Sequence, residues 1–598
     1  MNPRLITRAA LFVALLAAPG YADGPATVRV EKTPDGFTLT RDGKPYVIKG
    51  GGGDGPTKAL AEAGGNSVRT WGAEKAGAVL DEAQKHGLTV TLGIWLGHRR
   101  HGFDYDSADQ IAKQLEETRK IVLKYKDHPA LLMWGLGNEM EGYDKGDDGA
   151  IWSAVECLAA EVKRLDPNHP TMTVVAEIGG DRVKNLHRLC PSIDVIGINS
   201  YGGASTIPKR YKALGGAKPF VFGEFGPPGM WESAKTAWGA PIEATSTAKA
   251  NSYKEIYEQA IAPKGICVGS YAFTWGFKQE ATATWFGLFL PDGSKLAGVD
   301  ALTEMWTGKP PADRCPEIAS LTLEGPSEVE PGATVKASLK ATDPENSPLK
   351  VEWALVGETA RYAQGGDAEA ALPSFPESLT RSSTSSATLT MPKGGGGYRL
   401  YAYVRDGKGG AATANVPLFV KGSIEVPKAK VAKLPLIVYD ESATANPPFA
   451  PTGYMGNVKA VAMDPACADR PHAGKTCLQV KYADEKDWGG VVWQSPASDW
   501  GVRPGGFDLT GAKTLSFWAR GDQGGEVVTF EFGILGRDKA FFDTASAKLD
   551  KVALKREWTH YEIDLKGRDL TRIKTGFAWV IAADGKPVTF YLDDVRFE

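Results

Sequence analysis

The most constraining feature of this sequence is a regular alternation of short apolar runs with longer amphipathic segments, from Thr27 to Trp306. Strand-length runs separated by helix-length segments are typical of β-α units around a parallel sheet. After a hairpin at 37–45, eight such runs occur, at Tyr46–Lys49, Asn66–Trp71, Thr89–Trp95, Leu131–Gly137, Thr171–Glu177, Asp194–Tyr201, Phe220–Phe225 and Gly269–Trp275. Segments 73–86, 107–125 and 151–165 have helical periodicity. Eight strands with helical crossovers in about 280 residues predict a (β/α)8 TIM barrel.

The rest of the chain has a different character, rich in Thr, Val, Ser and turn residues. Hydrophobic cores stop growing beyond about 300 residues, so a chain of this length is expected to form several domains. We predict a (β/α)8 barrel at 23–310, an all-β immunoglobulin-like (Ig-like) sandwich at 315–421, a linker at 422–435 and a second all-β sandwich at 436–598.

Residues 1–22 have a basic tip, an apolar run from Ala9 to Ala18 and a small-residue exit at Ala22. This pattern predicts a cleaved signal peptide and a periplasmic or extracellular protein. The apolar run is shorter than the roughly 20 residues that cross a bilayer, and no membrane span is expected. The net charge of -3 provides no basic patch, so nucleic acid is not an expected partner.

The six cysteines form no Cys-x-x-Cys motif and no zinc-type cluster with histidine. In an exported chain this favours disulfides. Cys467 with Cys477 is the easiest local pair, and Cys157 with Cys190 and Cys267 with Cys315 complete the set in sequence order. Connectivity stays open, because six cysteines allow about fifteen pairings.

The active site of such a barrel lies at the C-terminal ends of the strands, so the residues that end the eight runs are the candidates. They are Asp54, Arg69, Trp71, Trp95, His98, Asn138, Glu139, Glu177, Asn199, Tyr201, Glu224 and Trp275. Two of them are carboxylates carried out of apolar strands, in Leu132-Met-Trp-Gly-Leu-Gly-Asn-Glu139 and Pro219-Phe-Val-Phe-Gly-Glu224.

With these motifs the first 310 residues resemble the clan A glycoside hydrolases, which carry Asn-Glu at the end of strand four and Glu at the end of strand seven. The resemblance implies Glu139 as general acid/base and Glu224 as nucleophile of a retaining mechanism. A glycosidic bond needs one protonated and one ionised carboxyl group, about 5 to 5.5 Å apart for retention. Arg69 and Tyr201 are expected to keep Glu224 ionised, and Asn138 to hold a sugar hydroxyl.

Substrate contacts are further expected from Trp71, Trp95 and Trp275, since indole rings stack on pyranose faces, and His98, in the loop after the third strand run, is a further candidate. A solvated loop explains His98 and His101 as well as a substrate contact does. Asp54, Glu177 and Glu280 could either belong to hydrogen-bond networks in the loops or bind sugar hydroxyls. We predict no metal in the barrel and no cofactor for catalysis. Gly50–Gly55 satisfies the dinucleotide pattern but lacks the acid expected about 20 residues later, so a flexible loop is favoured there.

The last domain is similar to the jelly-roll carbohydrate-binding modules in its Tyr439-Asp-Glu, Leu515-Ser-Phe-Trp-Ala and Tyr591-Leu-Asp-Asp-Val motifs. Aromatic candidates for sugar stacking are Tyr454, Trp488, Trp493 and Trp500, whereas Trp518 is expected in the core. Asp440, Glu441, Asp593 and Asp594 are candidate ligands of a structural calcium if the two ends of the domain meet.

These features predict a retaining β-glycoside hydrolase that acts on a β-linked polysaccharide or oligosaccharide, with β-glucan favoured. One alternative is a transglycosylase that uses the same glutamates, and a second is a non-catalytic glycan-binding envelope protein. Linkage, endo or exo action and oligomeric state stay open.

Overall fold

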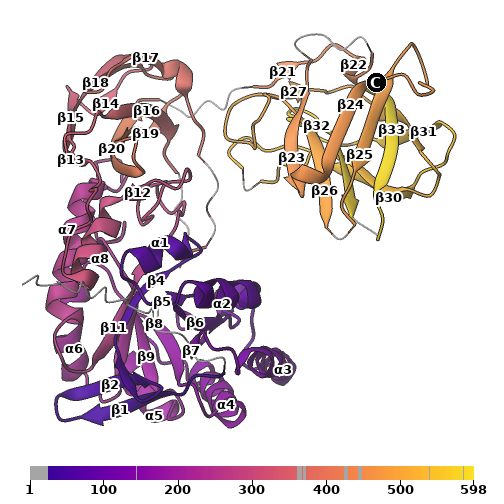
Figure 1. The fold of residues 1–598 in the computed structure, drawn as a ribbon. Helices are drawn as coiled ribbons and strands as arrows, with labels where there is room; N and C mark the ends of the chain where they lie inside the picture. Colours follow the sequence, from indigo (N-terminus) through magenta and orange to yellow (C-terminus); the bar gives the residue numbers. More distant parts are fainter. Residues whose placement is uncertain are drawn as a thin grey trace, which may run out of the picture.

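The computed structural model describes residues 24–142, 145–359, 366–367, 369, 372–422, 428–441, 447–485, 487–537, 539–582 and 585–598. The predicted signal segment, 1–22, lies outside this range. Figure 1 shows the chain as a barrel followed by two β-rich units. Among the described residues, no helix is long and apolar enough to cross a membrane.

Eight parallel strands close into a barrel, which confirms the predicted fold. They are β4 (Ile48–Gly52), β5 (Ser67–Arg69), β6 (Thr89–Ile94), β7 (Leu131–Leu136), β8 (Thr171–Ala176), β9 (Val195–Asn199), β10 (Phe220–Phe225) and β11 (Cys267–Phe273). The helices around them are α1 (Thr57–Glu62), α2 (Ala76–Lys85), α3 (Ala108–Tyr125), α4 (Gly149–Leu165), α5 (Arg182–Leu189), α6 (Ile207–Ala213), α7 (Ser246–Ile256) and α8 (Ala297–Thr307). The side chains of Ser107 and Asp148 cap α3 and α4 by accepting backbone N–H groups.

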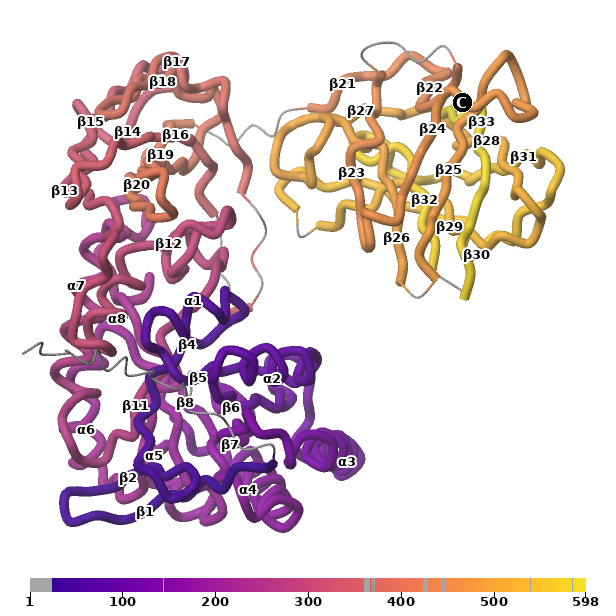
Figure 2. Tube along the Cα trace, viewed as in Figure 1, coloured from indigo at the N-terminus to yellow at the C-terminus, as the bar shows by residue number. Residues whose placement is uncertain are grey.

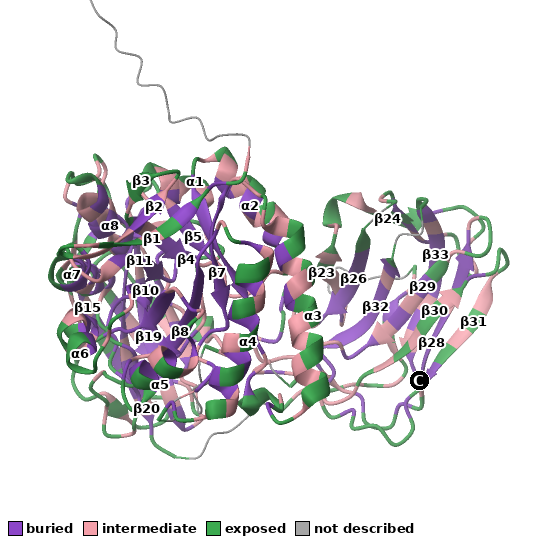
Figure 3. Cartoon of the chain, turned by 90° about the horizontal axis from the view of Figure 1, so that it is seen from below, coloured by how far each residue is buried: buried purple, intermediate pink, exposed green. Residues whose placement is uncertain are grey.

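The N-terminal end of the barrel is covered by an antiparallel sheet of β1 (Val28–Thr33), β2 (Gly36–Arg41) and β3 (Lys44–Tyr46). Val28 and Leu39 of this sheet pack against Ile48, Leu132 and other side chains of the barrel interior. This apolar plug closes one end of the barrel, which leaves the opposite end for a site. The barrel strands are buried almost throughout (Figure 3).

The first barrel strand extends further than its apolar run suggested. Gly50, Gly51 and Gly52 belong to β4 and not to a flexible loop. A Cβ at Gly50 would lie 2.2 Å from the Tyr271 ring, and one at Gly51 would lie 2.8 Å from Trp275 Cβ. The glycines are therefore required by close packing of β4 against the strand and the tryptophan beside it.

The Ig-like region consists of two facing sheets around an apolar core that includes Trp353 and Leu400. One sheet contains β12 (Lys295–Leu296), β14 (Glu328–Val329), β16 (Lys350–Gly357), β19 (Gly396–Arg405) and β20 (Gly410–Val420). The other contains β13 (Glu317–Glu324), β15 (Thr334–Thr342), β17 (Leu379–Ser382) and β18 (Ser386–Thr390). Strand β12 precedes α8, so a barrel segment pairs directly with this sandwich.

A buried polar network joins the barrel to the Ig-like sandwich. Glu243 accepts hydrogen bonds from Lys249 of α7 and, at 2.6 Å, from Asn415 Nδ2 of β20. Arg399 of β19 donates to Asn415 Oδ1 at 2.7 Å and to the carbonyl oxygen of Pro241 at 2.9 Å. Lys249, Arg399 and Glu243 are all buried. Separating the two units would leave these charges without their partners, which is costly for buried ion pairs.

The C-terminal sandwich is the third unit (Figure 2). One sheet contains β22 (Leu436–Tyr439), β24 (Val461–Cys467), β25 (Cys477–Tyr482), β28 (Thr514–Gly521), β31 (Thr559–Asp564) and β33 (Val588–Phe597). The other contains β23 (Ala450–Gly456), β26 (Trp488–Gln494), β29 (Val527–Phe532), β30 (Ala547–Ala553) and β32 (Thr575–Ala582). Strand β21 (Lys430–Val431), inside the predicted linker, pairs with β27 (Phe507–Asp508).

The predicted disulfides are absent, since all six cysteines are free thiols. Cys157 is exposed, whereas Cys190 is buried and its thiol donates to the carbonyl oxygen of Trp152 at 3.3 Å. The Cys315 thiol donates to the carbonyl oxygen of Lys295. Cys467 and Cys477 stand opposite each other in the β24–β25 ladder as thiols.

Candidate active site

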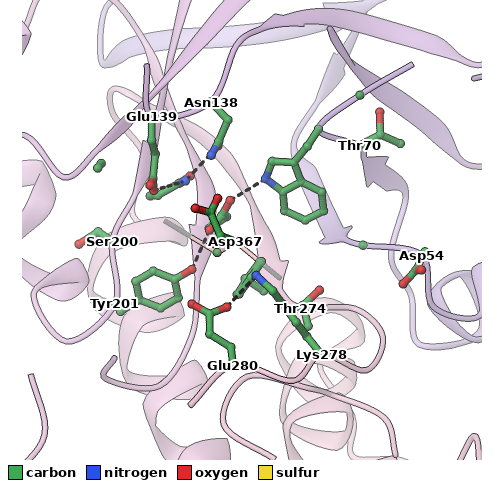
Figure 4. Close-up of a pocket in the computed structure, with 18 of the residues that line it drawn as sticks. Asp54, Thr70, Asn138, Glu139, Ser200, Tyr201, Thr274, Lys278, Glu280 and Asp367 are labelled. Atoms are coloured by element: carbon green, nitrogen blue, oxygen red, sulfur yellow. Dashed lines mark hydrogen bonds and ion pairs between the residues drawn. The ribbon is translucent and has the colours of Figure 1, made fainter. Parts of the chain in front are cut away.

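A cavity of about 1050 Å³ opens at the C-terminal ends of the barrel strands. Most of its wall is made of residues at or just after those strand ends, as expected for a barrel site. The wall contains Gly53, Asp54, Thr70, Trp71, Gly72, Glu74, Lys75, Ala76, Val79, Trp95, Asn138, Glu139, Ala176, Glu177, Asn199, Ser200, Tyr201, Glu224, Met230, Trp231, Glu232, Lys235, Pro241, Phe273, Thr274, Phe277, Lys278, Glu280, Gly366 and Asp367. Figure 4 shows how several of them point into the space.

Glu224, at the end of β10, is surrounded by hydrogen-bond donors. Its Oε1 accepts from Arg69 Nη1 at 3.1 Å and from the Trp71 indole N–H at 2.8 Å. Its Oε2 accepts from the Tyr201 hydroxyl at 2.7 Å. Burial and the adjacent Glu224 raise the pKa of Tyr201 well above its ordinary value, which keeps this hydroxyl a donor. Three donors, one of them the Arg69 guanidinium, thus surround this buried carboxyl group.

Glu139, just beyond β7, has a different environment. Burial, and next the charge of Glu224, raise the pKa of Glu139 to about 8, and one hydrogen bond from Asn199 Nδ2, at 2.8 Å, opposes this shift. Its backbone has a φ of 51°, a left-handed conformation that non-glycine residues seldom adopt. Backbone strain of this kind persists where the surrounding structure imposes it, commonly at functional sites.

Asn138 links a partner of Glu224 to a partner of Glu139. Its Oδ1 accepts from Arg69 Nη2 at 2.7 Å and from Asn199 Nδ2 at 3.2 Å. With the amide oxygen held from two sides, the amide nitrogen is the group that Asn138 presents to a ligand in the cavity. Arg69 thereby orients both Asn138 and Glu224, although it is buried behind the cavity wall.

The remaining acidic candidates also line the cavity. Glu177 is paired with Arg210, with Nη1 and Oε2 2.7 Å apart. Glu280 is paired with Lys278, with Nζ and Oε2 2.7 Å apart, and Figure 4 shows this pair at the cavity wall. Asp54 is part of the wall as well. Ion pairs hold Glu177 and Glu280 in place, while their position leaves them within reach of a ligand.

Two predicted substrate contacts lie outside this cavity. Trp275 is 2% exposed, donates its indole N–H to the carbonyl oxygen of Pro56, and packs against Phe289 and Trp306. It is a core residue because Gly51 lets it turn under β4. His98 is equally buried, stacks on Trp95 at 4.8 Å between ring centroids, and lines a smaller neighbouring cavity. The structure therefore places Trp275 and His98 away from the cavity that holds Glu139 and Glu224.

Sequence reasoning missed several aromatic residues of the wall. Trp231 is 54% exposed and meets the Tyr201 ring edge-on, with centroids 5.6 Å apart. Phe273 packs edge-on against both Trp71 and Tyr201. Phe277 follows β11 and is 40% exposed. The signal for Trp231 was its place directly after β10, in Gly226-Pro-Pro-Gly-Met-Trp, because such loops build the mouth of a barrel.

In the C-terminal sandwich the aromatic candidates divide by exposure. Tyr454, Trp488 and Trp500 are exposed, whereas Trp493 is buried in the core. Trp518 was expected in the core but lies outside it. Its ring stacks on that of His472, with centroids 3.8 Å apart.

The candidate calcium ligands have other partners. Asp593 Oδ2 accepts the N–H groups of His472 and Ala473, and Glu441 accepts that of Lys475. His472 Nδ1 lies 3.1 Å from Asp594. Among the described residues, no group of three or more His, Cys, Asp or Glu side chains is arranged to hold a metal ion.

Comparisons with known proteins agree with this geometry. Residues 66–230 match the family model described as Glycosyl hydrolases family 2, TIM barrel domain. A comparison with curated proteins found no match.

Among solved structures, a β-glucuronidase from Ruminococcus gnavus is 18% identical, with a TM-score of 0.37 over 48% of this chain and 53% of that one. An endo-β-1,4-mannanase from Thermotoga petrophila is 12% identical, with a TM-score of 0.34 over 64% of this chain and 99% of that one. The chain thus spans about half the length of the β-glucuronidase. The residues that match the TIM barrel domain of family 2 glycosyl hydrolases lie within the closed eight-stranded barrel, and they include Arg69, Asn138, Glu139, Tyr201 and Glu224.

Proposed function

We propose that this protein is a retaining β-glycosidase that cleaves a β-linked glycan by double displacement, with Glu224 as nucleophile and Glu139 as general acid/base. The observation that supports this assignment best is the contrast between the two carboxylates. Glu224 accepts from Arg69, Trp71 and Tyr201, whereas the pKa of Glu139 is raised to about 8. Two carboxyl groups with opposite protonation states are what glycoside cleavage requires.

In the first step Glu224 attacks the anomeric carbon while Glu139 protonates the glycosidic oxygen and the leaving sugar departs. In the second step Glu139, now ionised, removes a proton from water, which displaces Glu224 from the sugar. Asn138 is placed to donate its amide N–H to the hydroxyl on the second sugar carbon, since its oxygen is held by Arg69 and Asn199. When Glu224 leaves the anomeric carbon in this second step, Trp71 and Tyr201 stabilise its carboxylate by hydrogen bonds.

The charge of the cavity supports a neutral sugar as the substrate. Its wall carries eight carboxyl side chains and three lysines: Asp54, Glu74, Glu139, Glu177, Glu224, Glu232, Glu280 and Asp367, with Lys75, Lys235 and Lys278. With Glu139 protonated seven carboxylates remain, and Arg69, Arg210 and Arg100 pair with three of them, so the wall has no surplus of positive charge to hold a uronate. We therefore favour a neutral β-glucan or β-mannan over a glycan of uronic acids.

The exposed tyrosine and tryptophans of the C-terminal sandwich, Tyr454, Trp488 and Trp500, support a role for that unit in holding the polysaccharide. Export, as expected from residues 1–22, would place the protein where such polymers occur.

The mechanism is tested with a fluorinated deoxyglycoside that forms a slowly hydrolysed covalent intermediate, followed by mass spectrometry of peptides. We expect the label on Glu224 and a first product of β configuration by NMR. An α-configured product would exclude retention, and absence of turnover on a panel of β-glucans, β-mannans and β-xylans would exclude the proposed function. Products longer than the substrate at high oligosaccharide concentration would identify a transglycosylase.

A further inference from the structure

The cavity wall includes two residues from outside the barrel. Gly366 and Asp367 belong to the Ig-like region, between β16 and β17, yet both line the space that holds Glu139 and Glu224. Figure 4 labels Asp367 as one of the residues that line this cavity. The Ig-like sandwich therefore contributes to the site itself and is more than a spacer.

The described residues of this segment are anchored to two separate barrel loops. Asp367 Oδ1 accepts from Arg100 Nη2 at 3.1 Å, and Oδ2 lies 3.2 Å from His101 Nε2, in the loop after β6. Glu369 accepts the backbone N–H of Ala281 at 2.8 Å, in the loop after β11. The segment thus bridges loops that follow the third and the eighth strands of the barrel.

Exposed aromatic residues follow the same two barrel strands, β6 and β11, as the two anchor loops. Trp95, which ends the third strand run, is 42% exposed, and Phe277, after β11, is 40% exposed. Both line the same cavity as Asp367. The Trp95 ring is held in place by stacking on buried His98. His98 in turn lies 5.5 Å, between ring centroids, from His101, which pairs with Asp367. An exposed indole and a carboxylate that line one cavity suit a pyranose, because the ring covers the sugar face and the carboxylate accepts hydrogen bonds from its hydroxyls.

Asp367 also retains binding capacity. Its side chain remains 39% exposed while it is paired with Arg100 and His101. Each carboxylate oxygen accepts more than one hydrogen bond, so sugar hydroxyls can be bound without breaking either ion pair.

We propose that Asp367 is a substrate-binding residue of a sugar subsite that the barrel and the Ig-like sandwich build together, with a neutral hexose unit stacked on Trp95 and hydrogen-bonded to the Asp367 carboxylate. This inference rests on the proposed glycosidase function. It assigns the Ig-like sandwich a role in selecting substrates long enough to reach this subsite.

The test compares the full-length wild type with Asp367→Ala on an aryl β-glycoside and on gluco- and manno-oligosaccharides of increasing length. The aryl glycoside needs the catalytic centre alone. We expect Asp367→Ala to lower kcat/KM about tenfold or more on the longer oligosaccharides, mainly through KM, and to leave aryl glycoside hydrolysis within about twofold of the wild type. The matched control is Glu345→Ala, which removes an Ig-like carboxylate that pairs with Arg314 at 2.9 Å outside the cavity.

A second variant separates binding from anchoring. Arg100→Gln removes one ion-pair partner of Asp367 but keeps the Asp367 carboxylate. It should therefore lower kcat/KM on the longer oligosaccharides less than Asp367→Ala does. Equal losses on all substrates, or an Asp367→Ala profile identical to that of Glu345→Ala, would overturn the subsite. Either result would leave the proposed glycosidase function standing. That function is excluded by a different result, namely that the wild type hydrolyses none of the substrates.

A measurement without turnover completes the test. Calorimetry with Glu139→Gln protein, with and without Asp367→Ala, measures hexasaccharide affinity directly. We expect a loss of about tenfold with the added substitution, and an unchanged affinity would contradict the subsite.

Discussion

Arg69 Nη1 lies 3.1 Å from Glu224 Oε1, and the two side chains are 2% and 8% exposed. The same guanidinium donates to the Gly223 carbonyl oxygen and to Asn138, so a single buried cation organises the nucleophile and its neighbours. Glu139 has no comparable partner and is kept protonated by burial and by the charge of Glu224. This asymmetry leads to opposite expectations for the two glutamates.

Glu224→Gln should abolish turnover and also destabilise the barrel. The substitution leaves Arg69 buried without a counter-charge, which costs about 3 to 5 kcal/mol when a buried pair loses one partner. Thermal and denaturant unfolding measure the loss. A Glu224→Gln protein as stable as the wild type would show that Arg69 has enough other partners.

Glu139→Gln should instead raise stability at neutral pH while lowering activity. A carboxyl group whose folded pKa is raised destabilises the fold above its unfolded pKa of 4.5, and the penalty grows as pH rises toward 8. Each pKa unit corresponds to about 1.36 kcal/mol, so with partial screening we expect a gain of about 2 kcal/mol at pH 7. No gain at pH 7, measured against an unchanged stability at pH 4, would contradict the raised pKa.

The pH dependence of catalysis should show the same group. Glycoside cleavage requires protonated Glu139, so kcat/KM is expected to fall as pH rises through about 8. An activated aryl glycoside, whose leaving group needs less protonation, should be less affected. If the alkaline limb persists in Glu139→Gln protein, it belongs to another group.

Tyr201→Phe removes the hydroxyl that donates to Glu224 Oε2. A hydrogen bond to a charged group contributes about 1.5 to 3 kcal/mol, so we expect kcat/KM to fall about 10- to 100-fold. The control is Tyr211→Phe, which removes a buried hydroxyl that donates to the Lys218 carbonyl oxygen, away from the cavity. Equal effects of the two substitutions would argue against a role for Tyr201 at the nucleophile.

Glu243→Gln should weaken the junction between the barrel and the Ig-like sandwich. It leaves the buried Lys249 without its carboxylate, at a cost of about 3 to 5 kcal/mol. Scanning calorimetry should show the barrel and the Ig-like sandwich unfolding together at a lower temperature. Glu304→Gln, which breaks a partly exposed pair with Lys254, is expected to cost less than about 1 kcal/mol.

His98 should make the fold sensitive to acid. Burial, and next the charge of Arg100, lower the pKa of His98 from 6.5 to about 4. A basic group whose pKa is lower in the folded than in the unfolded state stabilises the fold fully above its unfolded pKa. The free energy of unfolding should therefore fall by about 3 kcal/mol as pH drops from 6.5 to 4. His98→Phe should show a smaller loss between pH 7 and pH 4, measured by denaturant unfolding. An identical pH dependence in both proteins would assign the acid sensitivity elsewhere.

The sequence alone determined the barrel and the two candidate catalytic positions. Apolar runs of strand length must be buried on both faces, so their number and spacing define the sheet, and the residues that end them reach one rim. This logic located Glu139, Glu224, Arg69 and Tyr201, which the structure brings together around one cavity.

Only the tertiary structure decided which candidates face the cavity. Trp275 ends a strand just as Trp71 does, but a glycine in β4 lets its ring turn into the core. The expected disulfides failed because thiol pairing depends on three-dimensional distance, which order along the chain does not encode. Asp367 could not be placed from the sequence, since it lies more than ninety residues beyond the last barrel strand and reaches the cavity through packing of one domain on another. Local patterns specify strands and their ends, whereas contacts between distant segments depend on how the finished domains pack.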